Sequence, residues 1–393
     1  MLDFTEDHKL AQNAIRAWCA AHLEPKVEKL ESGELSVYPV MRELGATFGI
    51  PDMARAAFRR MREKKDATKS GFGDTGLMSI LMMELSRCCP GFAMAFGATM
   101  GLFGGAVMAR GTDEQKQRWA LPVFALEKIG AWGLTEPNAG SDAFGSMRTV
   151  AKKADGGFRI SGQKTFITNA PYADQFVIYA RLADGERRDV RAFIIERSAK
   201  GVATGAPFKK MGMHASPTGE IFLDDVFVPD DQVLGGDGAT SAREAAKSSL
   251  SQERFGMTPM CLGIVDRCLE EAVKYAKQRE QWGRPIASFQ LVQEKIAKIY
   301  TARSIMHTLL MRQLEAEKTD VPLPTAEASA SKLYCARTTT ECALDAVQVL
   351  GGAGYMAGSV VEMLARDAKL FQIGGGTDEI QILRIAREIL ERP

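Results

Sequence analysis

Histidine is scarce in this chain, and its cysteines show no paired spacing. The 393 residues include four histidines, His8, His22, His214 and His307, which lie far apart, so a histidine-based metal site is not expected. The seven cysteines form no Cys-x-x-Cys pair, and the first residues show neither an apolar leader nor an Arg-rich presequence. An odd number of cysteines without a secretion signal predicts reduced thiols in the cytoplasm.

The sequence also lacks an excess of charge of either sign. Its formal net charge is +1, with 25% charged and 46% hydrophobic residues, a composition typical of a soluble globular protein. There is no basic stripe with interleaved aromatic residues, so a nucleic-acid partner is not expected. A basic cluster is formed by Arg55, Arg59, Arg60, Arg62, Lys64 and Lys65. We predict a solvated helix face or loop there; the alternative is a docking patch for a phosphate-bearing ligand.

One stretch is long enough to cross a bilayer, because the residues between Arg87 and Arg110 carry no charge. It is interrupted by Pro90, Gly91, Gly97, Gly101, Gly104 and Gly105. No second stretch of this kind occurs in the sequence. We therefore predict a buried central helix of the first domain and not a membrane span.

The hydrophobic periodicity changes twice along the chain, from helical to strand-like near Ile129 and back to helical near Thr240. The expected fold class is α+β, mainly α, with an N-terminal helical domain (1–124), a central small β domain (125–237) and a C-terminal four-helix bundle (238–393). The N-terminal helices are expected at Thr5–Leu30, Val40–Phe48, Thr75–Arg87, Phe92–Arg110 and from Asp113 onward. Thr5 and Thr112 are candidate N-caps.

Short strand candidates separated by Gly, Pro and Asp fill the central region. They are Gly157–Gly162, Lys164–Thr168, Gln175–Leu182, Val190–Glu196 and Glu220–Phe227. Their number and spacing suggest a small sandwich or barrel. The later helical runs are Ser249–Gln278, Gln290–Ala316, Ala326–Leu350 and Thr377–Arg392. Pro259 lies inside the first of these runs and should bend it just after Glu253-Arg254.

A loop rich in backbone and hydroxyl donors follows the apolar segment Ala131–Leu134. Its sequence, Thr135-Glu136-Pro137-Asn138-Ala139-Gly140-Ser141-Asp142, suits a flat polar ligand. With Leu134 it resembles one signature of the acyl-CoA dehydrogenase family, and Arg366-Asp367-Ala368-Lys369 through Gly376-Thr377 resembles the second. The resemblance covers nearly the whole chain, from about Phe4 to Ile389. It implies a FAD-dependent enzyme that is usually a homotetramer with one FAD in each subunit.

The resemblance also implies which residues hold the cofactor. Thr135, Ser141 and Thr168 could donate hydrogen bonds near the pyrimidine edge of the isoalloxazine, and Phe166 could supply a flat apolar wall. The segment from Arg279 to Gln290 resembles one that reaches the FAD of a neighbouring subunit. The cofactor-binding candidates are Trp132, Leu134, Thr135, Gly140, Ser141, Phe166, Ile167, Thr168, Arg279, Gln281, Trp282, Phe289, Gln290, Gln348, Val349, Gly351, Gly352, Thr377 and Glu379.

The reaction implied is α,β-dehydrogenation of an acyl-CoA thioester, in which a carboxylate removes the α-proton and the β-hydrogen leaves as hydride to flavin N5. Most members place that carboxylate directly before the Gly-Thr of the second signature, where this chain has Gly375. A minority branch, which resembles isovaleryl-CoA and long-chain dehydrogenases, places it before an Arg near the start of the first C-terminal helix. Glu253, followed by Arg254, matches that position, so we predict Glu253 as the catalytic base; the alternative is a surface ion pair.

Ser141, Arg254, Gly374 and Gly375 are the substrate-binding candidates. Because the two glycines open volume beside the flavin, we expect a branched, cyclic or otherwise bulky acyl group near Cβ. Two further hypotheses remain open: a relative with altered chemistry (desulfinase, nitroalkane-type oxidase or flavin monooxygenase), and a base-less FAD-binding subunit of a heteromer. The resemblance implies an electron-transfer flavoprotein as acceptor. The residues leave open the acyl group and whether CoA or an acyl carrier protein bears it.

Overall fold

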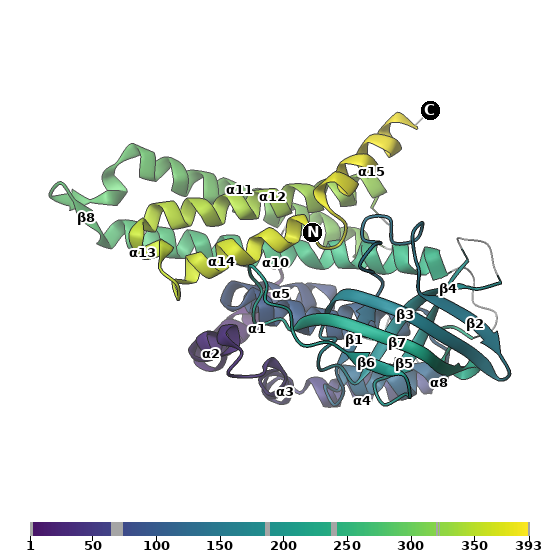
Figure 1. Cartoon of the computed structure of the whole chain (residues 1–393). Helices are drawn as coiled ribbons and strands as arrows, with labels where there is room; N and C mark the ends of the chain where they lie inside the picture. The colour runs from purple at the N-terminus through teal and green to yellow at the C-terminus, as the bar shows by residue number, and fades with distance from the viewer. Residues whose placement is uncertain are drawn as a thin grey trace.

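The computed structural model describes residues 3–63, 74–184, 189–236, 242–319, 321 and 323–391, and for 242–254 it describes the backbone without the side chains. A layer of long helices lies above a lower layer, in which N-terminal helices lie beside a twisted sheet (Figure 1). The predicted order of helical, β and helical regions is confirmed.

The N-terminal region contains α1 (Glu6–Trp18), α2 (Val27–Ser32), α3 (Val37–Thr47), α4 (Ile50–Arg62), α5 (Thr75–Cys88), α6 (Pro90–Gly97), α7 (Gly105–Arg110), α8 (Asp113–Gln115) and α9 (Leu121–Phe124). Both predicted N-caps are confirmed. The Thr5 hydroxyl accepts from the N–H of His8 at 3.3 Å, and the Thr112 hydroxyl accepts from the N–H of Gln115 at 3.2 Å. Each cap satisfies a backbone donor that the first turn of a helix leaves unpaired.

The predicted basic cluster lies partly on α4, where Arg55, Arg59, Arg60 and Arg62 are exposed. Arg55 pairs with Asp52 and Glu127 at 3.0 and 2.6 Å. The solvated helix face is therefore confirmed for these arginines, whereas Lys64 and Lys65 lie outside the described residues.

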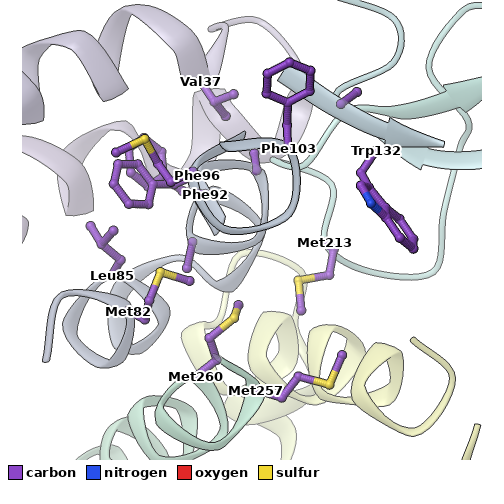
Figure 2. Close-up of a cluster of buried hydrophobic side chains, with 14 of the residues drawn as sticks. Val37, Met82, Leu85, Phe92, Phe96, Phe103, Trp132, Met213, Met257 and Met260 are labelled. Carbon is purple, nitrogen blue, oxygen red and sulfur yellow. The ribbon is translucent and has the colours of Figure 1, made fainter. Parts of the chain in front are cut away.

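The uncharged run forms a helix, Pro90–Arg110, in which α6 and α7 are joined by the π-helical segment Ala98–Gly104. Among the described residues it is the one helix long and apolar enough to cross a membrane by length and composition, and most of its apolar window is buried inside the molecule. Phe92, Phe96 and Phe103 are fully buried among residues of α5, β1 and α10 (Figure 2). The prediction of a buried central helix is confirmed.

The central strands are β1 (Gly130–Gly133), β2 (Val150–Ala154), β3 (Gly157–Thr168), β4 (Gln175–Leu182), β5 (Val190–Glu196), β6 (Val202–Thr204) and β7 (Thr218–Pro229). They form one seven-stranded sheet in the order β1-β4-β2-β3-β7-β6, with β5 paired to β4, instead of two stacked sheets. β1 and β2 run parallel to β4, and the other pairs are antiparallel.

Two features of this sheet correct the sequence prediction. The expected strands Gly157–Gly162 and Lys164–Thr168 are one strand, β3, because bulges at Ile160/Gly162 and Lys164/Ile167 shift its register without ending its pairing with β7. The short strands β2 and β6 were not predicted, and both are only partly buried, so they lack the apolar alternation that marks a strand in sequence.

The C-terminal region contains α10 (Ala242–Gln278), α11 (Gln290–Lys318), α12 (Thr325–Leu350), α13 (Gly352–Tyr355), α14 (Val360–Ala368) and α15 (Asp378–Leu390), with a small hairpin of β8 (Glu280–Gln281) and β9 (Arg284–Pro285). Pro259 lies inside α10, as predicted. The bundle docks closely on the N-terminal helices, since a Cβ at Gly263 of α10 would lie 2.1 Å from the Met83 carbonyl oxygen of α5. Figure 1 shows β8 and α13 at one end of the bundle and α15 at the other.

Shorter segments complete the backbone. Further π-helical turns cover Cys19–Leu23 and Lys116–Ala120, and 3-10 turns cover Glu24–Lys26, Asp230–Gln232, Ile286–Ser288 and Lys369–Gln372. All seven cysteines are buried and free.

Candidate active site

Trp132 and Leu134 lie at the end of β1, where the Thr135–Asp142 loop begins. The Trp132 ring packs edge-on against Tyr179 of β4, with ring centroids 5.1 Å apart, and both rings are buried. The indole Nε1 of Trp132 is buried and has no hydrogen-bond partner among the residues that the structure describes. Because a buried N–H normally has a partner, this donor is available to a ligand seated against the loop.

The next residues of the loop are fixed by a buried ion pair. Lys164 of β3 is 0% exposed and donates from Nζ to Glu136 Oε1 at 2.8 Å and to the Leu134 carbonyl at 3.1 Å. The Glu136 carboxylate also accepts from the backbone N–H groups of Arg148 and Thr149, at 2.6 and 2.9 Å. One carboxylate therefore ties both ends of the 134–149 loop to β3.

Burial and charge act in opposite directions on this pair. Burial lowers the pKa of Lys164 to about 8, although the Glu136 charge opposes the change. For Glu136, burial alone would raise the pKa, but the Lys164 ammonium and the N–H donors outweigh it, so the pKa lies below its usual value. Both groups are consequently charged at neutral pH.

Phe166 presents an open aromatic surface beside this loop. It lies at the second bulge of β3 with φ of 57°, in the left-handed region, and its side chain is 68% exposed. Ile167 is buried and Thr168 partly exposed, while nothing lies within 4 Å of a Cβ placed at Gly140. Gly140 and Ser141 are exposed on the same loop. A largely exposed ring, which packs against Phe208 on one side, nearby hydroxyls and a buried indole N–H together fit the isoalloxazine of a flavin.

Hydrogen bonds from neighbouring residues fix the glycine turn of the second signature, Gly374–Gly376. The Gly374 N–H donates to the Leu370 carbonyl at 2.8 Å, and Gly375 and Gly376 have φ of 63° and 91°. The buried Lys332 of α12 donates to the Gly376 carbonyl at 2.8 Å, and Gln381 donates to the same oxygen at 2.9 Å. Thr377 then caps α15, and Glu379 is exposed in its first turn. Left-handed φ at two successive positions explains why glycine occupies them.

Methionines line the space between the glycine turn and β1. A Cβ at Gly374 would lie 3.7 Å from the Cε of Met257 on α10. Figure 2 shows Met257 and Met213 pointing toward one another, with Met260 on the same helix and Trp132 on the far side of Met213. Glu253 and Arg254 precede Met257 on α10, in the part of that helix whose side chains the structure does not describe.

The remaining cofactor candidates lie at the other end of the bundle. Arg279, Gln281 and Trp282 belong to the β8–β9 hairpin region, and Trp282 is 87% exposed with its ring 5.5 Å from that of Phe289. Gln348 and Val349 end α12, and nothing lies within 4 Å of a Cβ at Gly351 or Gly352. Gln290 begins α11 and is exposed. Within one chain the candidates therefore form two groups, one on the β domain and the start of α15 and the other at the β8 and α13 end of the bundle (Figure 1).

Sequence reasoning missed Lys164, Lys332 and Gln381, which hold the loop and the glycine turn in place. A signal was available for Lys164, because it is a charged residue in a predicted strand, two residues before Phe166. For Lys332 and Gln381 the helical pattern contains nothing unusual. Lys332 reaches a backbone carbonyl 44 residues away, whereas Gln381 reaches the same carbonyl from five residues away. Met213 and Met257, which are buried near the glycine turn, were also not named from the sequence.

A helical domain, a β domain with a bare aromatic ring beside a hydroxyl-rich loop, and a helical bundle define a flavin-binding enzyme. Sequence models of this class match three successive parts of the chain: "Acyl-CoA dehydrogenase, N-terminal domain" at residues 5–127, "middle domain" at 131–226 and "C-terminal domain" at 243–390. The chain therefore belongs to the acyl-CoA dehydrogenase family. It is a flavoprotein oxidoreductase whose cofactor is FAD.

Individual relatives agree with this assignment. The chain is 33% identical to the 3-(aryl)acrylate reductase of Clostridium sporogenes over 99% of its own length and 100% of that protein. It is 36% identical to the mitochondrial isovaleryl-CoA dehydrogenase of Arabidopsis thaliana, covering 79% of this chain and 76% of that protein. Among solved structures, butyryl-CoA dehydrogenase of Megasphaera elsdenii superposes with a TM-score of 0.88 at 28% identity, covering 100% of both chains.

Proposed function

We propose that this enzyme removes an α-proton and a β-hydrogen from an acyl-CoA thioester with a bulky acyl group, using Glu253 as the base. The observation that carries the proposal is that Met257 lies close to the glycine turn. A Cβ at Gly374 would lie 3.7 Å from the Met257 Cε, so this part of α10 faces the turn. Position 253 lies about one helical turn before Met257, on the same face of the helix.

A base is needed at that place because the usual one is missing. Gly375 has no side chain, and its φ of 63° disfavours any replacement with a Cβ. We propose that the carboxylate at position 253 acts beside this turn, where Met213 and Met257 are buried. Desolvation of this kind raises the basicity of a carboxylate toward a weakly acidic C–H. Arg254 remains the candidate for substrate binding.

The residues of the β domain would orient the cofactor in this proposal. Phe166 would support the flat ring, and Thr135, Ser141 and Thr168 would donate or accept at its polar edge. The buried Trp132 N–H and the start of α15 at Thr377 offer further donors. When bound, FAD supplies the acceptor for the β-hydrogen and its electron pair.

The test of the base is Glu253→Gln, with Glu270→Gln on the same helix as the matched control. Glu270 is about half exposed and pairs with Arg87 of α5. Under anaerobic conditions, substrate should bleach the flavin of the wild type and of Glu270→Gln but not of Glu253→Gln, while all three retain FAD. Unchanged bleaching by Glu253→Gln would remove Glu253 from this role. A wild type that binds FAD without bleaching by any thioester would favour a relative with altered chemistry or a base-less subunit.

The acyl group is proposed to be branched or ring-bearing. Methionine side chains adapt to irregular shapes and make favourable contacts with aromatic rings. We expect Gly374 and Gly375, which have no side chains, to leave room for a substituent at the β-carbon of the acyl group. Turnover of isovaleryl-CoA and of a ring-bearing thioester should therefore exceed that of butyryl-CoA. A strict preference for short linear chains would contradict the proposal.

A second candidate is the reverse reaction, reduction of an aryl-substituted enoyl thioester. It is favoured by the match over the full length of the relative named 3-(aryl)acrylate reductase. The two directions are distinguished by reducing the enzyme-bound flavin and adding each substrate. Rapid reoxidation by the aryl-enoyl thioester, with slow bleaching by the saturated one, would favour the reductase.

We also propose a homotetramer in which each active site uses two subunits. One group of cofactor candidates lies on the β domain and the start of α15, and the other lies at the β8 and α13 end of the bundle, so a single copy does not bring them together. Exposed apolar side chains gather near the second group: Trp282, Leu291, Tyr355 and Met356 are between 58% and 87% exposed. Native mass spectrometry should show four copies, and Trp282→Ala should lower both assembly and FAD retention. The proposed electron acceptor is an electron-transfer flavoprotein, and the proposed compartment is the cytoplasm.

A further inference from the structure

The ion pair between Lys164 and Glu136 holds the loop on both sides of Thr135, which is a candidate donor to the flavin. The Leu134 carbonyl accepts from Lys164, the Glu136 carboxylate accepts from the same ammonium, and Thr135 lies between them. The Thr135 carbonyl itself accepts from the N–H of Thr165, at 3.0 Å. Two adjacent residues of β3, Lys164 and Thr165, therefore donate to Thr135 and to both of its neighbours.

The same pair also connects Thr135 with Phe166. Lys164 lies two residues before Phe166 on β3, at the start of the bulge that ends at Ile167. Phe166 is exposed, whereas Lys164 and Thr165 are buried. A shift of the loop relative to β3 would change the distance from Thr135 to the Phe166 ring. The pair thus fixes the relative positions of the hydroxyl and the aromatic surface.

Both charges lie out of reach of solvent, with Lys164 0% and Glu136 4% exposed. A buried ion pair is weak evidence of a stabilising role, because similar apolar or neutral groups often serve stability equally well. The advantage of such a pair is geometric, because charge-assisted hydrogen bonds fix the positions of their partners more tightly than neutral ones do. Stability alone therefore does not explain why two charges occupy this place.

We infer that Lys164 and Glu136 are positioning residues for the flavin, which hold Thr135 against β3 so that the loop is already shaped for FAD before it binds. The inference rests on the proposed placement of FAD beside Thr135 and Phe166. Neither residue contacts the reacting atoms in this account. Their effect is on the affinity for FAD and on the environment of its ring.

The experiment compares Lys164→Met, Glu136→Gln, the double variant and Arg159→Met. Arg159 lies on the same strand in an exposed pair with Asp225, at 2.9 Å, and is the matched control. The double variant is essential because it leaves no buried charge without a partner, so it should fold even if a single variant does not. Apoprotein stability, the dissociation constant of FAD and the visible spectrum of the bound flavin are measured for each.

The double variant is expected to be about as stable as the wild-type apoprotein yet to bind FAD about tenfold more weakly, with a shifted flavin band. Tenfold corresponds to the loss of one well-placed charge-assisted hydrogen bond. Arg159→Met should match the wild type in all three measurements. A double variant with wild-type affinity and spectrum would overturn the inference and leave the proposed function intact. A wild type that binds no FAD would instead overturn the proposed site itself.

Discussion

Asp367 should make the stability of this protein depend on pH, and Asp367→Asn should remove that dependence. Asp367 lies on α14, fully buried, where Oδ1 accepts from the N–H of Met213 and Oδ2 has no hydrogen-bond partner in the described part of the chain. Burial raises its pKa from 3.8 to about 7, helped by the negative charge of Glu31 and opposed by Met213 N–H, Arg366 and Lys210. The folded chain therefore holds a proton here that the unfolded chain releases near pH 4.

The sign and size follow from these two pKa values. Because the folded pKa is the higher one, the stabilisation is complete below pH 3.8 and is lost as the pH rises through about 7. A difference of about three pH units, at about 1.4 kcal/mol each, sets a ceiling of about 4 kcal/mol, of which about 3 kcal/mol falls between pH 5 and 8. An asparagine keeps the acceptor for Met213 and does not ionise.

The assay is urea unfolding of the FAD-saturated protein at several pH values between 5 and 8, for the wild type and Asp367→Asn. The free energy of unfolding of the wild type, relative to the variant, should fall by about 2 to 3 kcal/mol across this range, with the variant the more stable at pH 8. Asp230→Asn, which breaks an exposed pair with Lys153, is the control and should parallel the wild type. Parallel curves for Asp367→Asn would refute the reasoning, because they would mean that Asp367 has the same pKa in both states.

Three further predictions concern stability and reactivity. Gly263→Ala should lower the free energy of unfolding, measured by denaturation, by about 1–3 kcal/mol, because the new Cβ would lie 2.1 Å from the Met83 carbonyl oxygen. Gly256→Ala, on the same helix, is the control. No atom lies within 4 Å of a Cβ at that position, so this variant should be neutral or slightly stabilising in the same assay. Thr112→Ala should cost about 1 kcal/mol through loss of the α8 cap, and an unchanged denaturation midpoint would contradict this. Burial raises the pKa of every cysteine thiol. A thiol reagent should therefore modify the native protein slowly, and it should modify all seven cysteines after unfolding. Rapid labelling of the native protein would contradict this prediction.

Local signals in the sequence predicted the elements of the fold well. Thr5 and Thr112 begin helices because a hydroxyl followed by a helical pattern satisfies the first free N–H groups, and that rule needs no distant partner. The strands Gln175–Leu182 and Val190–Glu196 were predicted with the bounds that the structure shows, since each is a mostly buried apolar run between turn residues. The division of β3 was wrong because Gly162 suggests a break in sequence, whereas pairing with β7 continues past it.

The candidate site was predicted only in part. The loop at Thr135 and the glycine turn carry recognisable signatures, so their residues were named from sequence. Their supports were not, because a lysine in a strand or helix does not reveal in sequence which carbonyl or carboxylate it will reach. The Glu253 assignment stays a prediction, although the neighbouring contact between Met257 and Gly374 favours it.

The order of residues alone determined the family, the cofactor class and the succession of helical, β and helical regions, because periodicity, caps and signature motifs are local properties. Only the tertiary structure decided that Lys164 joins Glu136 across 28 residues, that Met257 meets the glycine turn, and that the cofactor candidates divide between two ends of the bundle. These arrangements depend on how strands register and helices cross, and many chain paths are compatible with the same local pattern. Packing selects one of those paths, since only there are the buried charges paired and the apolar faces covered.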